Sequence, residues 1–585
     1  MYLIHTSLKR YLEGLSSQAK DNDLAPFALT TEAAHLEMSR ICTNYLSLQD
    51  FNDDHFQRAP YSVENSCQFL DFDPEYSGID FMLNSEDLES SEKGFKFFDY
   101  CAINWTTHVA LASQSAAEDA GILAAVVKIC TEKSSVLRNW LNYHWSTLGS
   151  RKERHYGFDP MVVASYFGLD AVTLSLIDKG LVDVAKSGPR ALYWAANEGR
   201  TSNVKILLSH DVPTSFKSIL DWTPLMRAAS AGHTETVKAL LSVNEIEVNE
   251  TTSCGRTALS YAIGNGHIEI SRLLMSTPNI NVNNIDSEES TPLIYAVSDG
   301  NEDALRLLLA DGRAHLAHVN RHDRTALSFA AEYGHIEVMK LLLAQPSHST
   351  NLKLENHRKC SPLLYAVEKG HLEIVKLLRD SGRINFSATN KEGFNTVILA
   401  SKYHHVNVLQ YLSVQDPEGF KGIDLSLPTP LGFAFIENGP RRLKAIEYLL
   451  ETNLVDLEQR DSKSGRTTLF RASASGFVEG VQRLIDKGAK LDVVDERGWT
   501  PLHYVIALSR NPEMVDCLLS NGANLNIRDN DKLTPMELAK KHSKEDANPQ
   551  LSEIIQILGE KMTEIAVLKA ERKKAQKSGL NSRNM

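Results

Sequence analysis

The chain lacks the features of a membrane or secreted protein. No apolar run in its 585 residues approaches the roughly 20 residues that a membrane-spanning helix requires. The longest apolar patch, Gly121 to Val127, ends at Lys128, and the N-terminus lacks the apolar core of a signal peptide. The seven cysteines are dispersed, with none at Cys-x-x-Cys spacing, which is typical of a reduced protein. We therefore expect an intracellular protein of the cytoplasm, the nucleus or both, with no membrane contact.

Motifs of catalysis and of phosphate binding are missing as well. The chain contains no G-x-x-x-x-G-K-[ST], G-x-G-x-x-G, G-x-S-x-G or His-Glu-x-x-His. The net charge of −12 disfavours general affinity for nucleic-acid phosphates, which clustered Lys and Arg would provide. His315, His318 and His322 have a metal-like spacing, but they surround a turn that offers no cage of cysteines or carboxylates. We therefore expect neither an enzyme nor a cofactor, a metal site or direct nucleic-acid binding.

The chain does contain a short sequence motif, named here the start phrase, that recurs every 33 to 38 residues from Thr223 onward. Each copy has Thr, Ser or Asn first, often Pro or Ala second, and an apolar residue third. The first residue suits a helix N-cap, and Pro suits the first helical position, where its missing N–H costs nothing. Each copy therefore predicts the start of a helix. The ten copies begin at Thr223, Thr257, Thr291, Thr325, Ser361, Asn395, Thr429, Thr467, Thr500 and Thr534.

A stop and a second helix follow most of these starts. Nine residues after Thr223 stands Gly232-His233, and the Gly-His pair recurs in several later copies. Glycine readily takes the left-handed conformation that ends a helix. An apolar-periodic segment such as Val338–Leu343 then predicts a second helix, and a polar turn leads to the next copy. His404-His405 occupies the Gly-His position of a less regular copy.

The start, the stop, the second helix and the period together resemble the ankyrin repeat, whose phrase T-P-L-H-x-A recurs about every 33 residues. The phrase is most complete at Thr500-Pro501-Leu502-His503. Weaker units near Asp159-Pro160 and Arg190-Ala191-Leu192 extend the array to about twelve units over residues 156–550. The resemblance implies an all-α solenoid of helix pairs joined by β-turn fingers, with a concave face that holds protein partners.

One position of the first helix is rich in aromatic residues. Four residues beyond the cap, seven of the twelve units carry an aromatic residue, whereas the 8% aromatic content would give about one. Equivalent positions form a ladder along the concave face, and partly exposed rings are typical anchors for a protein partner. Alternatively, the rings pack between repeats, where the family commonly places leucine. The seven candidates for partner binding are Trp194, Tyr261, Tyr295, Phe329, Tyr365, Phe433 and Tyr504.

Residues 1–150 lack the period and are expected to form an irregular helical domain. Leu3–Leu12 resembles the end of the winged-helix segment that follows the NTPase in fungal NACHT-type (STAND) proteins. Ala34–Leu46 and Phe98–Trp105 resemble the helical spacer that leads to C-terminal ankyrin repeats in that family. Because the chain has no Walker motif, the resemblance implies a truncated relative or the rear portion of such a receptor, without ATP binding. Residues 71–93 mix carboxylates with apolar residues, as in a disordered loop or an acidic activation segment.

Residues 551–585 are expected to form a capping helix and a disordered basic tail. The basic run Arg572–Lys577 is either a charged helix face or a nuclear-localisation patch. The sequence thus supports three hypotheses. The first is a non-enzymatic scaffold that binds a protein partner on the concave face. The second is a nuclear transcriptional coregulator, for example in fungal gene regulation, that acts through a DNA-bound factor. The third is the ligand-sensing arm of a truncated STAND/NACHT receptor.

Overall fold

The computed structural model describes residues 158–243, 246–346, 359–382, 388–421, 428–546 and 548–581, with residues 118–129 and positions 36, 39, 40, 42, 105, 106 and 109. The predicted winged-helix-like segment, most of the predicted helical spacer and the acidic loop 71–93 lie outside the described residues. Before the repeats, α5 (Ala120–Ile129) buries Ile122 and Val126. The chain divides into two compact units, residues 1–287 and 288–585, which are described separately.

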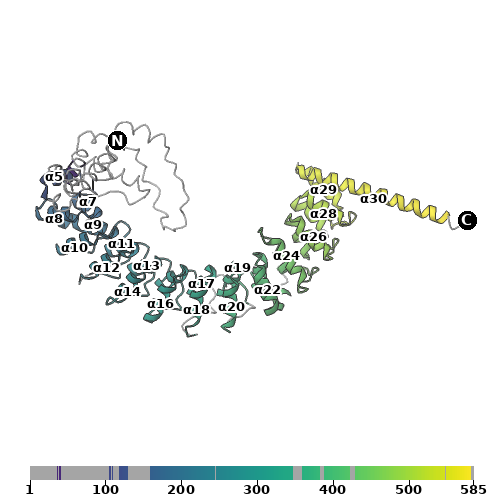
Figure 1. The fold of residues 1–585 in the computed structure, drawn as a ribbon. Helices are drawn as coiled ribbons and strands as arrows, with labels where there is room; N and C mark the ends of the chain where they lie inside the picture. The colour runs from purple at the N-terminus through teal and green to yellow at the C-terminus, as the bar shows by residue number, and fades with distance from the viewer. Residues whose placement is uncertain are drawn as a thin grey trace, which may run out of the picture. The chain divides into compact units, whose positions relative to one another are not determined.

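Among its described residues, the first unit contains four helix pairs (Figure 1). The first helix of each pair contacts the first helix of the next, and the second helices do the same. Each pair therefore buries an apolar face that it could not cover alone. The pairs are α7 (Pro160–Phe167) with α8 (Asp170–Asp178), α9 (Val184–Asn197) with α10 (Thr201–Ser209), α11 (Pro224–Ala231) with α12 (Thr234–Leu241), and α13 (Ala258–Gly264) with α14 (Ile268–Met275).

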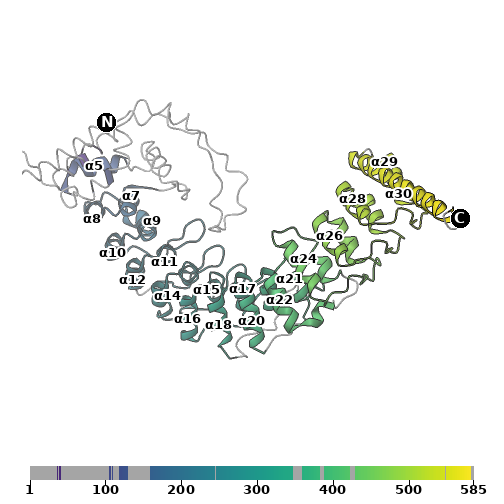
Figure 2. The ribbon, with the colours of Figure 1, turned by 45° about the vertical axis from the view of Figure 1, so that its right-hand side comes forward.

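The part of the second unit that the structure describes contains eight further pairs in two layers. In Figure 2, α15, α17 and α21 lie in one layer and α16, α18, α20 and α22 in the other. The all-α solenoid of the prediction is therefore confirmed over the described residues. The elements are α15 (Pro292–Ser298), α16 (Glu302–Asp311), α17 (Ala326–Tyr333), α18 (Ile336–Leu343), α19 (Pro362–Lys369), α20 (Leu372–Asp380), α21 (Thr396–Lys402), α22 (Val406–Gln415), η4 (Pro417–Lys421), α23 (Pro430–Phe433), α24 (Arg442–Glu451), α25 (Thr468–Ala474), α26 (Val478–Asp486), α27 (Pro501–Tyr504), η5 (Val505–Ser509), α28 (Pro512–Ser520), α29 (Pro535–Glu545) and α30 (Pro549–Asn581).

The recurring phrase caps the first helices as its chemistry predicts. The Thr257 hydroxyl accepts a hydrogen bond from the Ser260 backbone N–H at 3.2 Å, and the Thr325 hydroxyl accepts one from Ser328 at 3.3 Å. At the other end of α17, Gly334 takes a φ of +81°, a left-handed conformation that a side chain would strain. The hydroxyl cap at the start and the left-handed glycine at the end set the length of the first helix in most repeats.

The predicted start of the second repeat was wrong. The sequence placed it near Arg190, but α9 begins at Val184, where the Asp183 carboxylate accepts hydrogen bonds from the backbone of Ala185 and Lys186. Pro189 lies inside the helix instead of at its first position. The error arose because Ala191-Leu192 matches the second and third residues of the start phrase. The true start carries an acidic cap, which is equally able to accept from orphan backbone N–H groups.

The repeat that begins at Thr429 departs from the others. Its first helix, α23, is four residues long, and no Gly-His stop follows it. Before this repeat, η4 buries the Phe420 side chain completely. After α23, the buried guanidinium of Arg442 donates hydrogen bonds to the Phe435 carbonyl at 2.5 Å and to the Asn438 side chain at 2.8 Å. Arg442 thus satisfies acceptors that a longer helix would have satisfied.

The last helix combines a buried start with an exposed continuation. Leu551, Ile554 and Leu558 of α30 are fully buried, and α30 contacts α28 and α29. Met562, one turn further along the helix, is 45% exposed. The helix continues through the expected basic tail to Asn581. The first half of α30 therefore covers the apolar end of the array, as a terminal repeat must.

Candidate partner-binding site

Three of the seven aromatic candidates are packed inside the protein. Trp194, Tyr261 and Phe433 are 7%, 8% and 4% exposed. Each contacts another ring: Trp194 lies 5.3 Å from Phe158, Tyr261 lies 4.2 Å from Trp222, and Phe433 lies 4.8 Å from Phe394, measured between ring centroids. Burial raises the pKa of Tyr261 to about 12. For these three, the structure matches the alternative in which the rings pack between repeats.

The other four candidates are half-buried: Tyr295, Phe329, Tyr365 and Tyr504. Between two of them lies a guanidinium that the sequence analysis did not select. Arg324 stacks 3.9 Å from the ring centre of Phe329 in its own repeat and 4.8 Å from that of Tyr365 in the next. Arg324 also forms an ion pair with Glu332 at the end of the same first helix. Guanidinium cations therefore lie against the aromatic rings of this row, and the quadrupole of each ring attracts the cation to its face.

The same pairing recurs because arginine stands directly before three of the caps. Arg256 precedes Thr257 and stacks 4.3 Å from Tyr261, and Arg466 precedes Thr467 and lies 4.4 Å from Tyr504 of the next repeat. Where arginine takes the ring position itself, as Arg227 does, it stacks 4.2 Å from Trp222. The recurring Arg-Thr dipeptide was visible in the sequence and could have pointed to these contacts.

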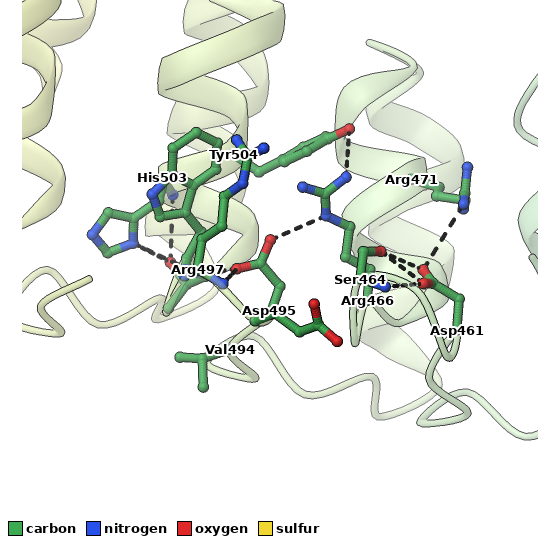
Figure 3. Close-up of polar contacts among 12 residues, drawn as sticks. Asp461, Ser464, Arg466, Arg471, Val494, Asp495, Arg497, His503 and Tyr504 are labelled. Atoms are coloured by element: carbon green, nitrogen blue, oxygen red, sulfur yellow. Dashed lines mark hydrogen bonds and ion pairs between the residues drawn. The ribbon is translucent and has the colours of Figure 1, made fainter. Parts of the chain in front are cut away.

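The clearest of these clusters lies in the second unit, between the repeats that begin at Thr467 and Thr500. Figure 3 shows Arg466 between Asp495 and Tyr504: its Nε donates to Asp495 at 3.1 Å, and Nη1 lies 3.5 Å from the Tyr504 hydroxyl. The Asp495 side chain is 1% exposed, and it also accepts from the backbone of Arg497 and Trp499 at 2.9 and 3.0 Å. Asp495 thus fixes the turn and the arginine together.

A second carboxylate has the same role in the preceding repeat. Asp461, with a side chain 3% exposed, accepts hydrogen bonds from the backbone N–H and the hydroxyl of Ser464 at 2.6 and 2.7 Å. The Arg471 guanidinium lies 3.8 Å from the other carboxylate oxygen (Figure 3). The carboxylates therefore serve mainly to shape the turns, and each holds one arginine beside the first helix.

Histidines after the first helices join neighbouring repeats. In each case a ring nitrogen donates to a backbone carbonyl near the end of the preceding first helix, because a carbonyl oxygen can only accept. The bonds are His233 to Asn197 (3.1 Å) and His267 to Ser230 (3.1 Å) in the first unit, and His335 to Ser298 (2.9 Å), His371 to Glu332 (2.9 Å) and His405 to Glu368 (2.8 Å) in the second. His404 bonds in the opposite direction, to the Ala434 carbonyl at 2.9 Å.

Three buried or half-buried histidines should make the stability of the second unit depend on pH. Burial lowers the pKa of His404, of His405 and of His503 below the ordinary value of 6.5. The folded chain keeps the rings neutral where the unfolded chain protonates them, so the stabilisation is complete above about pH 6.5 and is lost as the pH falls below it. We expect a lower melting temperature at about pH 5.5 than at about pH 7.5 by differential scanning calorimetry.

A glutamine variant provides the control for this pH effect. His405→Gln keeps an N–H for the Glu368 carbonyl but has no proton to gain. It should therefore reduce the difference between the two melting temperatures while retaining the stability seen at the higher pH. An unchanged difference in the variant would contradict the role of His405.

The turn histidines do not assemble a metal site among the described residues. His318 donates to the Glu289 carbonyl at 2.7 Å, and His322 lies 3.3 Å from the Glu288 carboxylate. Over the stretches of the chain that the structure describes, no group of three or more His, Cys, Asp or Glu side chains is placed to hold a metal. Within the same stretches, no helix is both long and apolar enough to cross a membrane.

Comparison with known proteins identifies the family. The family model described as "Ankyrin repeats (3 copies)" matches residues 211–286, 278–353, 347–421 and 470–565, which together exceed half of the chain. The chain therefore belongs to the ankyrin-repeat family, and the helix pairs, caps and turns described above are ankyrin repeats. The arrays of this family bind protein partners.

Individual relatives share stretches of the array. A putative ankyrin repeat protein of Fowlpox virus, FPV031, is 28% identical over 174 residues, which are 28% of this chain and 48% of that protein. The E3 ubiquitin-protein ligase hecd-1 of Caenorhabditis elegans is 36% identical over 114 residues, 20% of this chain and 4% of the ligase. The chain thus spans less than half of these curated relatives. The human ASB11 ankyrin repeat domain matches at 26% identity and a TM-score of 0.33, covering 38% of this chain and 96% of that domain.

Proposed function

We propose that the chain is a non-enzymatic scaffold that holds a protein partner on its concave face, formed by the first helices and the turns before them. The observation that carries the proposal is the row of half-buried rings with guanidinium groups stacked on them, at Phe329, Tyr365 and Tyr504. Tyr, Trp and Arg contribute most of the binding energy in many protein interfaces. Rings already held by arginine lose little side-chain entropy when a partner arrives, which favours binding.

Replacing the central rings should weaken partner binding more than it weakens the fold. In the triple variant Tyr295→Leu, Phe329→Leu and Tyr365→Leu, leucine retains apolar packing but removes the three flat rings, two of which contact Arg324. We expect loss of the proteins that the wild-type chain captures from a cell extract, measured by affinity purification and mass spectrometry. Leucine, the common residue of the family at this position, should keep the circular dichroism melt close to that of the wild type.

Matched substitutions on the second helices test whether partner binding depends on the face formed by the first helices. Glu337 of α18 and Glu373 of α20 are exposed and form ion pairs with lysines of their own helices. The double variant Glu337→Gln and Glu373→Gln should retain all captured proteins. If the leucine variant also retains them, the rings are packing residues and the proposal fails.

The exposed basic end of α30 supports a second candidate, a nuclear coregulator. Arg572 and Lys573 are exposed on a helix that continues past its buried first half. A basic run of this kind is a typical nuclear-localisation patch. A fluorescent fusion of the whole chain should accumulate in the nucleus, and Arg572→Gln with Lys573→Gln should reduce that accumulation. Exclusion of the wild-type fusion from the nucleus would contradict this candidate.

A further inference from the structure

The repeat that begins at Thr500 carries a strip of large apolar side chains at the start of its first helix. Trp499 precedes the cap, Tyr504 follows one turn into the helix, and Leu508 follows in η5. The two aromatic rings lie 6.5 Å apart in an edge-to-face arrangement and are half-buried, and Leu508 is 56% exposed. Leu508 follows Tyr504 by four residues, a spacing that places side chains on one helical face, and the contact between the rings adds Trp499 to the same strip.

Two arginines contact this strip, and a third lies beyond them (Figure 3). Arg466 stacks on Tyr504, Arg497 lies 5.3 Å from the ring centre of Trp499, and Arg471 stands on α25 of the preceding repeat. Figure 3 shows Arg466, Arg497 and Tyr504 grouped closely, with Arg471 beyond Arg466. We name Arg466, Arg471, Arg497, Trp499, Tyr504 and Leu508 the Arg–Trp patch.

The arginines of the Arg–Trp patch keep donors available for a ligand. Arg471 is 37% exposed, and its guanidinium contacts Asp461 at 3.8 Å, beyond hydrogen-bond distance. The Arg497 guanidinium is exposed and forms no hydrogen bond to another described residue. Each guanidinium has five N–H donors in a planar fork that matches a carboxylate. Because Asp461 and Asp495 are buried and already accept from the turn backbone, they do not use up these donors.

Charge and shape together select the chemistry of the ligand. Asp461, Asp495 and Asp529 are buried, whereas the guanidinium groups of Arg471 and Arg497 are accessible beside one exposed carboxylate, Glu496, so the accessible charge of these residues is net positive. The rings beneath the guanidinium groups are apolar and rigid, and they favour contact with an apolar side chain. A nucleic-acid backbone would offer phosphates but no apolar side chain for Leu508, and three arginines are few for a phosphate track.

We infer that the Arg–Trp patch binds an acidic segment of a protein partner, with carboxylates paired to Arg471 and Arg497 and a large apolar side chain packed on Tyr504 and Leu508. This inference deepens the proposed function and rests on it. The Arg–Trp patch would select a partner segment of negative charge, whereas the rings around Arg324 would supply further contact area. Guanidinium groups held against rings lose little freedom on pairing, which favours bidentate contacts.

Synthetic peptides test the inference on the full chain. The probe is a fluorescein-labelled peptide of alternating Glu and Leu, and the matched probe has Gln in place of every Glu. Fluorescence anisotropy should show binding of the acidic peptide and at least roughly tenfold weaker binding of the Gln peptide. Raising the salt from about 50 mM to about 300 mM should weaken the acidic complex, because the paired charges are partly exposed.

Variants locate the binding site. The double variant Arg471→Gln and Arg497→Gln should lose roughly tenfold or more in affinity for the acidic peptide, and Leu508→Ser should lose affinity for both peptides. Arg483→Gln is the matched control, because Arg483 is an exposed arginine of α26 that pairs with Glu447 at 3.3 Å on a second helix. Its affinity should equal that of the wild type. Circular dichroism checks that every variant is folded.

The outcomes separate this inference from the proposed function. Equal binding of the acidic and Gln peptides, or unchanged affinity in Arg471→Gln with Arg497→Gln, would overturn the inference. If the triple leucine variant nevertheless loses captured proteins, the scaffold proposal stands and the acidic segment is wrong. If the acidic peptide binds as expected while the leucine variant retains every captured protein, the patch stands and the wider concave interface is wrong.

Discussion

Arg442→Ala is expected to lower the free energy of unfolding of the second unit by about 3 kcal/mol. The side chain is 7% exposed and donates to the Phe435 carbonyl and the Asn438 side chain. It also stacks 4.5 Å from the ring centre of Phe477. Alanine would leave the buried carbonyl without its donor and open a cavity beside the ring. Burial lowers the pKa of Arg442, which shows that its surroundings are poorly solvated.

Urea denaturation followed by circular dichroism measures the overall loss. Hydrogen exchange adds a local readout, because the amides that follow α23 should exchange faster in the variant. The neighbouring Arg441 is exposed, so Arg441→Ala is a matched control that should leave both measurements unchanged. Equal effects of the two substitutions would show that Arg442 does not hold the short helix in place.

Asp495→Ala should be nearly as damaging, with a loss of about 3 kcal/mol. The carboxylate accepts from Arg466 and from the backbone of Arg497 and Trp499, and removing it leaves all of these donors unsatisfied. A half-buried guanidinium without its buried partner is costly because desolvation is no longer offset. Thermal and urea unfolding should both report the loss.

Two further substitutions divide this effect into its components. Asp495→Asn keeps an oxygen for the turn backbone but removes the charge that faces Arg466, so we expect a smaller loss than with alanine. Glu496→Gln changes an exposed carboxylate at the next position and should leave the unfolding curve unchanged. An asparagine variant as unstable as the alanine variant would assign the whole effect to the ion pair.

The repeat architecture could be predicted because each of its determinants is local. A Thr hydroxyl accepts a hydrogen bond from the backbone N–H three residues later, and a glycine ends the helix through its own backbone freedom. The period of the repeats and the positions of their first helices can therefore be read from the sequence alone. The misplaced start at Arg190 had the same origin: Ala191-Leu192 matches the start phrase, whereas the helix begins earlier, at the cap provided by Asp183. Likewise, the four-residue α23 depends on Arg442, whose contact with Phe435 spans a loop that no periodicity encodes.

The candidate site could be predicted less completely, because exposure depends on neighbouring repeats. Position alone grouped Tyr261 with Tyr504, yet the ring of Trp222 covers the first while the second remains half-buried. The stacked arginines come from the turn of another repeat or from the residue before the cap. The turn aspartates were missed too, although Asp or Asn five residues before a cap, as at Asp495 and Asp529, is a regular feature of the sequence.

The histidine bonds have a consequence for how the array responds to denaturant or force. In the second unit, bonds from His335, His371 and His405 back to the preceding repeat form a regular series, which ends at the irregular repeat beginning at Thr429. At the equivalent place in the next repeat stands Phe477, which has no such donor. Cooperativity in a linear array depends on the interface between neighbours, so a change in the type of interface divides it into blocks. The short α23 therefore marks the boundary between two cooperative blocks. We expect the second unit to unfold in steps there instead of in one transition.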